Sequence, residues 1–171
     1  MGQAIDRIAI LSEDTYGKLF LKKLVERINV GYKVIVDRFV GVCNTKSTRQ
    51  VKAKLELACV DRVIIVVDAD CGPEDEVYRR VICHIPRNLR HRVKIVIVKT
   101  EIEEWICRSL GIKHGCKPSD DLNKYVQRKY GRKYTKSMLP SFADKIDIEK
   151  LAENSASFTE LLVELEKLYP S

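Results

Sequence analysis

Val63-Ile64-Ile65-Val66-Val67-Asp68-Ala69-Asp70 is the stretch that decides the fold. Its five apolar residues follow one another without alternation, which is typical of a strand buried on both faces of a parallel sheet. A parallel sheet places its ligand site at the carboxyl ends of its strands, where Asp68 and Asp70 stand. Two neighbouring carboxylates repel each other unless a cation joins them, and Mg²⁺ or Mn²⁺ prefers oxygen ligands. The pair is therefore either a metal site or a polar turn that closes the strand.

The residues around this stretch alternate between short apolar strands and amphipathic helices. Strands are expected over 7–11, 34–40, 62–67 and 93–98, and helices over 15–30, 49–59, 73–85 and 101–110. A polar turn is expected over 45–48. The apolar stripe of the first helix is expected to consist of Tyr16, Leu19, Phe20, Leu24 and Ile28. This alternation predicts an α/β fold with right-handed crossovers and a mainly parallel four-stranded sheet covered by helices on both faces. A strand order of 2-1-3-4 would place the first strand beside the third.

Every acidic cluster follows the end of a predicted strand. Glu13 comes after the first strand, the two aspartates after the third, and Glu101 to Glu104 after the fourth. Because the carboxyl ends of parallel strands share one edge, we expect these acids to lie close together. The alternative is that Glu13 and residues 101–104 are acids favoured at helix N-termini by the helix dipole.

The amino-acid composition limits the classes of protein to which this chain can belong. The 171 residues are 45% hydrophobic and 32% charged, which is typical of a globular protein. The longest wholly apolar run has five residues, so no segment is expected to enter a membrane, and the N-terminus lacks the pattern of a signal peptide. We therefore expect a cytoplasmic location. The net charge of +7 favours a polyanionic partner, nucleic acid first.

The region from residue 113 onwards is basic and helical. Residues 113–136 contain eight Lys or Arg and two Asp, with tyrosines among them. Such a mixture can hold phosphates and stack bases, although a helix with a solvated basic face would have the same composition. The side chains expected to contact nucleic acid are Lys124, Arg128, Lys129, Arg132 and Lys133. Two further helices close the chain. Asp147 is expected to cap the first, over 148–153, and Ser155 or Ser157 the second, over 158–168.

The six cysteines show no C-x-x-C spacing of a zinc or redox motif. Cys59, Cys83 and Cys107 fall in apolar helical patterns, where a thiol packs as a small hydrophobic group. All six would be free in a mesophile cytosol, whereas a thermophile can form intracellular disulfides. The sequence leaves this choice open.

The order of these motifs resembles that of Toprim domains, the catalytic modules of topoisomerases, primases and OLD-type nucleases. A glutamate after the first strand (Glu13) and Asp-x-Asp after the third (Asp68-Ala69-Asp70) carry the resemblance. The chain is more specifically similar to stand-alone Toprim-like proteins of unknown function related to OLD-type nucleases. The further matching segments are Glu101-Ile102-Glu103-Glu104-Trp105, Lys117-Pro118, Leu122-Asn123, Tyr134-Thr135-Lys136 and the serines before Phe158. Asp14 stands where that family usually has glycine.

The resemblance implies a Toprim-like (Rossmann-like) catalytic core over residues 1–112 and a basic helical extension, residues 113–171, packed on it in one domain. It also implies a nuclease that cleaves phosphodiester bonds of DNA or RNA with Mg²⁺ or Mn²⁺, where two ions roughly 3.5–4 Å apart can act together. The implied metal ligands are Glu13, Asp68, Asp70, Glu101 and Glu103. The implied catalytic residues are Glu13, Asp68, Asp70, Lys99 and Lys136, with Lys99 or Lys136 neutralising negative charge in the transition state.

Two alternatives belong to other classes. The first is a non-catalytic module that binds nucleic acid or protein and retains a degenerate Toprim site. The second is a receiver-like phosphoacceptor domain, which Thr100 after the fourth strand would suit. A receiver needs a fifth strand followed by a lysine, and the sequence predicts no fifth strand. Strand preference, a protein partner and the oligomeric state are left open.

Overall fold

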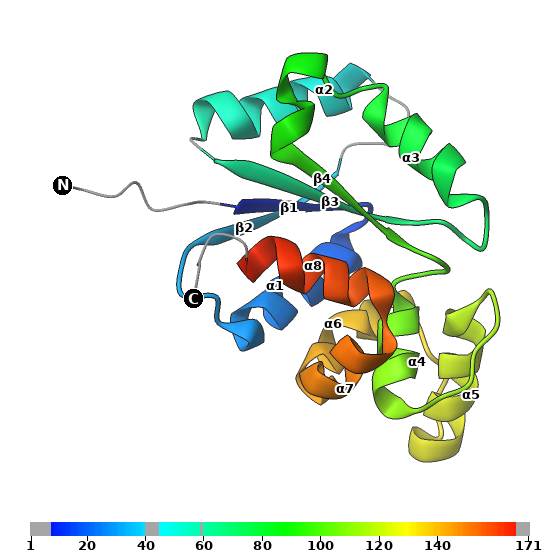
Figure 1. The fold of residues 1–171 in the computed structure, drawn as a ribbon. Coiled ribbons are helices and arrows are strands. Elements are labelled where there is room, and N and C mark those ends of the chain that lie inside the picture. The colour runs from blue at the N-terminus through cyan, green and yellow to red at the C-terminus, as the bar shows by residue number, and fades with distance from the viewer. Residues whose placement is uncertain (1–7, 40–44, 59, 167–171) are drawn as a thin grey trace.

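The structure is a computed structural model that describes residues 8–39, 45–58 and 60–166. Four parallel strands form one sheet in the order β2-β1-β3-β4 (Figure 1). The strands are β1 (Ile8–Ser12), β2 (Val34–Arg38), β3 (Arg62–Asp68) and β4 (Val93–Val98). The predicted α/β fold and strand order are confirmed, and this is the Rossmann-like arrangement expected of a Toprim-like core.

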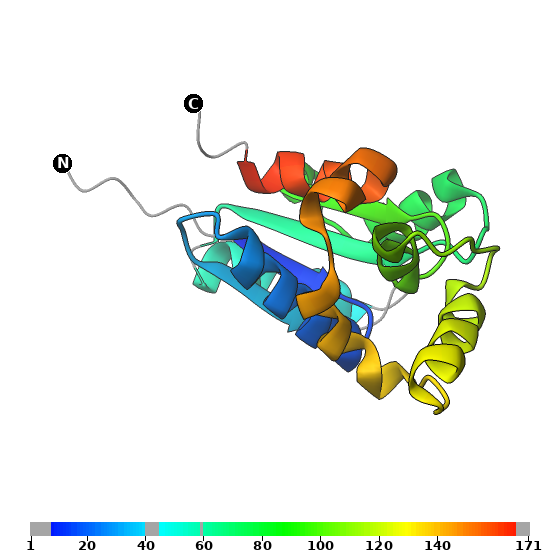
Figure 2. The same cartoon turned by 90° about the horizontal axis from the view of Figure 1, so that it is seen from below.

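Helices cover both faces of the sheet, as predicted. One face carries α2 (Thr45–Lys52) and α3 (Glu74–Ile82), which lie above the sheet in Figure 1. Figure 2 shows the opposite face, where α1 and α8 lie over the strands. The helices on that side are α1 (Thr15–Ile28), α4 (Glu103–Leu110), α5 (Pro118–Tyr130), α6 (Leu139–Phe142), α7 (Ile148–Asn154) and α8 (Ala156–Glu166). Within the described ranges, no helix has the length and apolar character needed to cross a membrane.

Strand β3 is buried on both faces, which explains its unbroken apolar run. Val63, Ile65 and Val67 pack with the α2 and α3 side. Ile64 and Val66 pack with α1 and α8 on the other side. All five side chains are at most 3% exposed. Because side chains alternate along a strand, each face of a central strand needs its own apolar set.

Helix α1 buries part of the predicted apolar stripe, since Phe20 and Leu24 are fully buried as expected. Tyr16 and Leu19, which were expected in the apolar stripe, are 40% and 41% exposed. Leu21 and Val25 are buried instead. The helix begins after Asp14, whose Oδ1 accepts a hydrogen bond from the backbone N of Gly17 at 2.7 Å. It ends at Asn29 in the left-handed region, two residues before the predicted stop at Gly31.

The second helix begins earlier than its sequence indicated. Residues 45–48, expected as a polar turn, form the first turn of α2. A π-helical turn, Ala53–Leu57, then continues the helix towards β3. The predicted end of the second strand at Val40 lies outside the described residues, as does the predicted end of this helix at Cys59.

The last third of the chain packs into the same core as the strands. One hydrophobic cluster contains Ile10 of β1, Trp105 of α4 and Phe158 of α8. The predicted caps are confirmed, since Asp147 accepts from the backbone N of Lys150 and a serine accepts from that of Phe158. Helix α6 was not predicted. The division at residue 112 stays a prediction, and the hydrophobic cluster extends across it.

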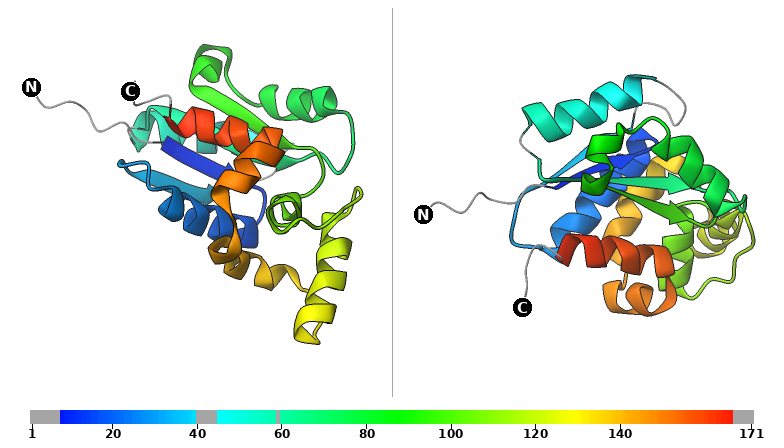
Figure 3. Two further views of the ribbon diagram at one scale, coloured as in Figure 1. Left: turned by 60° about the horizontal axis from the view of Figure 1, so that its bottom comes forward. Right: turned by 45° about the horizontal axis from the view of Figure 1, so that its top comes forward.

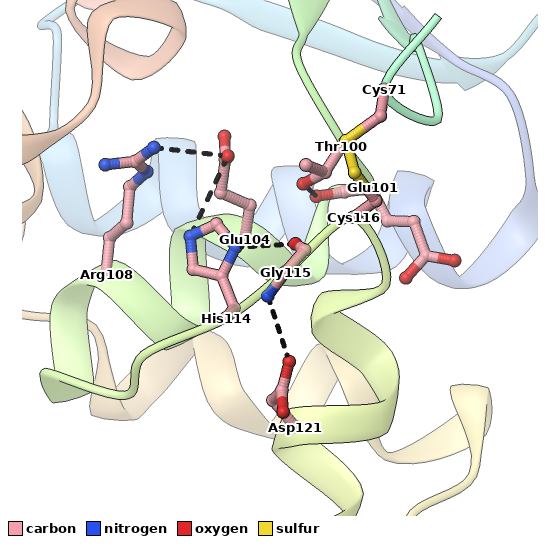
Figure 4. Close-up of a disulfide and its surroundings, with 9 residues drawn as sticks. All are labelled: Cys71, Thr100, Glu101, Glu104, Arg108, His114, Gly115, Cys116 and Asp121. Atoms are coloured by element: carbon pink, nitrogen blue, oxygen red, sulfur yellow. Dashed lines mark hydrogen bonds and ion pairs between the residues drawn. A yellow bond between two sulfur atoms is a disulfide. The ribbon is translucent and has the colours of Figure 1, made fainter.

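Two cysteines form a disulfide, which the sequence had left open. Cys71, just after β3, is bonded to Cys116 in the connection between α4 and α5 (Figure 4). Cys107 is buried, as predicted, but Cys83 is exposed, contrary to the prediction, because it follows the last turn of α3. The two other cysteines lie outside the described residues.

Candidate active site at the carboxyl edge of the sheet

The pairing of β1 with β3 brings Glu13 to the first aspartate. Ser12 is in register with Val66, so the residues that follow the two strands leave the sheet side by side. The backbone N of Asp68 donates a hydrogen bond to Oε2 of Glu13 at 3.3 Å. The strand order therefore produces the contact that the acidic pattern predicted.

The loop after β3 holds Asp70 in a constrained backbone conformation. Asp70 and Cys71 have φ of +50° and +60°, in the left-handed region that costs a non-glycine residue about 1–2 kcal/mol. Their backbone N atoms donate to the carbonyls of Thr100 and Lys99 at 3.0 and 2.9 Å. These two bonds fix the loop against the segment after β4, and the disulfide of Cys71 with Cys116 fixes it to the connection between α4 and α5.

Glu103 is a buried carboxylate at the start of α4. It is 1% exposed, and a carboxylate at that depth needs hydrogen-bonding or charged partners. Its Oε1 accepts from the hydroxyl of Tyr134 at 3.0 Å and lies 3.1 Å from Nζ of Lys136. Nζ of Lys136 also lies 3.7 Å from a carboxylate oxygen of Asp14. The Tyr-Thr-Lys segment thus supplies both partners of Glu103.

The carboxyl groups at this edge perturb one another. Burial, followed by the negative charge of Glu13, raises the pKa of Asp68 to about 8, and Lys136 opposes the shift. Burial also raises the pKa of Glu13, against a lowering by the Asp68 amide. Burial disfavours the charge on Lys136, but Glu103 and then Asp14 raise its pKa overall. Negative charge therefore exceeds positive charge at this edge of the sheet. Carboxyl groups with shifted pKa values are typical of functional sites.

The structure therefore groups five of the predicted site residues, namely Glu13, Asp68, Asp70, Glu103 and Lys136. Within the part of the chain that the structure describes, no three acidic, histidine or cysteine side chains converge as a finished metal site. The donors are nevertheless all carboxylate oxygens with excess negative charge. This chemistry fits a hard divalent cation such as Mg²⁺ or Mn²⁺.

Two of the predicted site residues, Glu101 and Lys99, lie outside this group. Glu101 accepts from the backbone N of Ser119 at 3.1 Å, so its carboxylate caps the N-terminus of α5. Lys99 lines a separate cavity of about 150 Å³ that also contacts Glu104 and Arg108. Figure 4 shows Glu104 directed to Arg108 and His114, away from the Cys71–Cys116 disulfide.

The sequence missed two contributors to the site and one basic residue. Asp14 reaches Lys136, and Tyr134 holds Glu103. Lys145, which lies beside the Tyr130 ring at the end of α5, was not among the predicted basic residues. The signal for Asp14 was present, because it stands where the resembled family usually has glycine. Nothing in the spacing of Tyr134 or Lys145 indicated which residues they would contact.

The predicted nucleic-acid contacts differ in their surroundings. Arg128 and Lys133 are exposed on α5 and just after it. Lys124 is paired with Asp121 at 3.2 Å, which reduces its availability to a phosphate. Lys129 and Arg132 lie beside tyrosine rings.

No family model and no curated protein matches this chain. Two solved structures are similar to it, both of the C-terminal region of the OLD protein of Xanthomonas campestris pv. campestris. The structure phased with iodine has 16% identity and a TM-score of 0.40 over 97% of this chain and 89% of that chain. The structure phased with platinum has 16% identity and a TM-score of 0.37 over 95% and 77%. Identities and TM-scores this low do not assign the chain to a family, so the proposals below rest on the geometry and chemistry of the site.

Proposed function

We propose that this protein is a Mg²⁺- or Mn²⁺-dependent phosphodiesterase of the Toprim type that cleaves nucleic acid. One observation carries the proposal. Carboxylates from the ends of β1, β3 and the start of α4 crowd at one sheet edge, and their burial and mutual repulsion raise the pKa of Asp68 to about 8. A divalent cation relieves such crowding, because it compensates the charge that these carboxylates place together.

Asp68, Asp70 and Glu13 are the residues that would hold the ion. Bound there, Mg²⁺ or Mn²⁺ supplies a Lewis acid and an activated water for attack on phosphorus. The Asp68 amide holds Oε2 of Glu13. Burial raises the pKa of Glu13, which favours a role for its carboxylate in proton transfer.

Lys136 and Glu103 complete the proposed machinery. Nζ of Lys136, between Glu103 and Asp14, provides positive charge for the phosphate oxygens as negative charge develops on them. Glu103 orients Lys136, and Tyr134 orients Glu103. The proposal does not need Glu101 or Lys99, because the first caps α5 and the second lines another cavity.

The test is cleavage of labelled single-stranded and duplex DNA and RNA with Mg²⁺, with Mn²⁺ and with EDTA. We expect metal-dependent cleavage by the native protein and a loss of at least about a hundredfold in Asp68→Asn. The matched control is Asp120→Asn, an exposed aspartate in the first turn of α5, which should cleave like the native protein. Cleavage that survives in Asp68→Asn, or that proceeds in EDTA, would contradict the proposal.

A second candidate is a nucleic-acid-binding protein that does not cleave. It is favoured by the ion pairs of Lys136 with Glu103 and Asp14, since this lysine already neutralises part of the acidic site. In that case the assay gives no products, while binding weakens steeply with added salt. A receiver-like role has less support, since the sheet within the described residues has four strands.

A further inference from the structure

Three cationic side chains surround one exposed tyrosine at the end of α5. Nζ of Lys145 lies 4.5 Å from the centre of the Tyr130 ring, Nζ of Lys129 5.6 Å and the guanidinium carbon of Arg132 6.0 Å. Tyr130 is 38% exposed. We call these four residues the Tyr130 cluster. Lys145 comes from the turn Ala143–Lys145, so two segments of the chain build the cluster.

The cations of the Tyr130 cluster lack acidic partners. Among the residues that the structure describes, Lys129, Arg132 and Lys145 form no ion pair with a carboxylate. Nζ of Lys145 donates instead to the hydroxyl of Tyr130 at 2.5 Å, and this hydrogen bond lowers the pKa of Tyr130. Lys124, earlier in the same helix, is by contrast paired with Asp121 at 3.2 Å. The cluster is therefore a concentrated positive charge that is free to meet phosphates.

The cluster is also connected to the acidic edge of the sheet. Figure 3 (left) shows α5 projecting away from the sheet. From Tyr130 the chain returns within six residues to Lys136, which contacts Glu103. Six residues span at most about 21 Å. At about 3.4 Å per nucleotide, a strand of roughly six nucleotides can reach from the cluster to the acids.

We infer that the Tyr130 cluster binds single-stranded nucleic acid, with phosphates on the three cations and a base stacked on the Tyr130 ring. The strand class follows from the aromatic ring. An exposed ring among cations stacks unpaired bases, whereas a duplex hides its base faces except at the ends. This inference deepens the proposed function, because it names the class of substrate that the acidic site receives.

The experiment measures binding in EDTA, so that cleavage plays no part. Fluorescence anisotropy would follow a labelled oligothymidylate of about twelve nucleotides and a duplex of the same length. We expect tighter binding of the single strand by the native protein. Tyr130→Ala should weaken that binding by about tenfold or more, and Tyr130→Phe, which keeps the ring, should retain most of it.

Charge variants test the phosphate contacts. Lys145→Gln should reduce the slope of log affinity against log salt by about 0.7, the value for one phosphate contact on a single strand. Lys94→Gln is the matched control and should leave the slope unchanged, because Lys94 lies near the amino end of β4, is paired with Glu160 at 3.7 Å and is not among the expected nucleic-acid contacts. Circular dichroism of each variant establishes that α5 is retained.

Equal affinity for duplex and single strand, or a Tyr130→Ala variant that binds like the native protein, would overturn the inference. The two proposals fail separately. Single-strand binding that depends on Tyr130, without any metal-dependent cleavage, would support the cluster and refute the nuclease. Cleavage that depends on Asp68 but does not change in the Tyr130 and Lys145 variants would support the nuclease and refute the role of the cluster.

Discussion

Replacing Asp68 by asparagine should stabilise the metal-free protein at alkaline pH. The pKa of Asp68 rises from 3.8 to about 8 in the folded state, first through burial and then through Glu13. A carboxyl group with a raised pKa contributes most to stability below its unfolded pKa, where both states hold the proton. As the pH rises through the window from about 4 to about 8, the unfolded chain releases its proton while the folded protein keeps it. Asparagine removes this dependence.

The size of the effect follows from the width of that window. While the folded state holds one extra proton, the free energy of unfolding falls by about 1.4 kcal/mol per pH unit. Over the four units between 3.8 and about 8 the loss approaches about 6 kcal/mol. This is a ceiling, because proteins respond to buried charge with an effective dielectric constant near 20. Relative to the native protein, Asp68→Asn should raise the free energy of unfolding by several kcal/mol at pH 9 and leave it almost unchanged at pH 4.

Urea unfolding in EDTA at pH 4 and pH 9 measures both differences. Asp144→Asn is the control, because Asp144 is 70% exposed and pairs loosely with Lys23 at 4.0 Å, so its removal should change stability by less than about 0.5 kcal/mol. Equal effects of Asp68→Asn at the two pH values would refute the reasoning, as would a loss of stability at pH 9. Mn²⁺ should stabilise the native protein at pH 9 and leave the variant unchanged.

Three further predictions concern single contacts. Tyr134→Phe removes the hydroxyl that donates to buried Glu103, and it should lower the free energy of unfolding by about 1–3 kcal/mol in urea. A variant as stable as the native protein would show that this hydrogen bond contributes nothing. Asp14→Ala removes the cap of α1 and should cost about 1 kcal/mol by thermal unfolding, whereas Asp14→Asn, which can also cap, should cost little. Reduction of the Cys71–Cys116 bond frees a 45-residue loop and should cost up to about 4 kcal/mol, with the Cys83→Ser variant responding to reductant like the native protein.

The fold was predictable because its signals are local. The apolar run of β3 and the regular alternation of strands and helices are read from neighbouring residues. The topology rules for parallel sheets then restrict the strand order to a few alternatives, of which 2-1-3-4 is one. Helix α1 shows where such signals end. Tyr16 and Leu19 fit its apolar spacing, yet the structure leaves them exposed and buries Leu21 and Val25 instead. The periodicity predicted the burial of Phe20 and Leu24 correctly, and tertiary packing determined which of the neighbouring side chains are buried with them.

The candidate site was predictable only where it depends on the order of the strands. Strand ends placed Glu13 beside Asp68, because the sheet order determines which ends are neighbours. The contacts of Tyr134 and Lys136 with Glu103 join residues more than thirty positions apart, and no pattern in the sequence encodes such a pairing. The same holds for the disulfide, since cysteine spacing alone does not determine connectivity.

The position of α8 has a consequence for synthesis of the chain. Phe158, Leu161 and Leu165 of this helix are fully buried in the cluster that covers one face of the sheet. Glu164 pairs with Arg62 at the start of β3, more than one hundred residues earlier. Until residues 156–166 leave the ribosome, the part of that apolar face that α8 covers remains open to water. We therefore expect a chain stalled at residue 150 to be sensitive to protease, and native packing to form after these residues emerge.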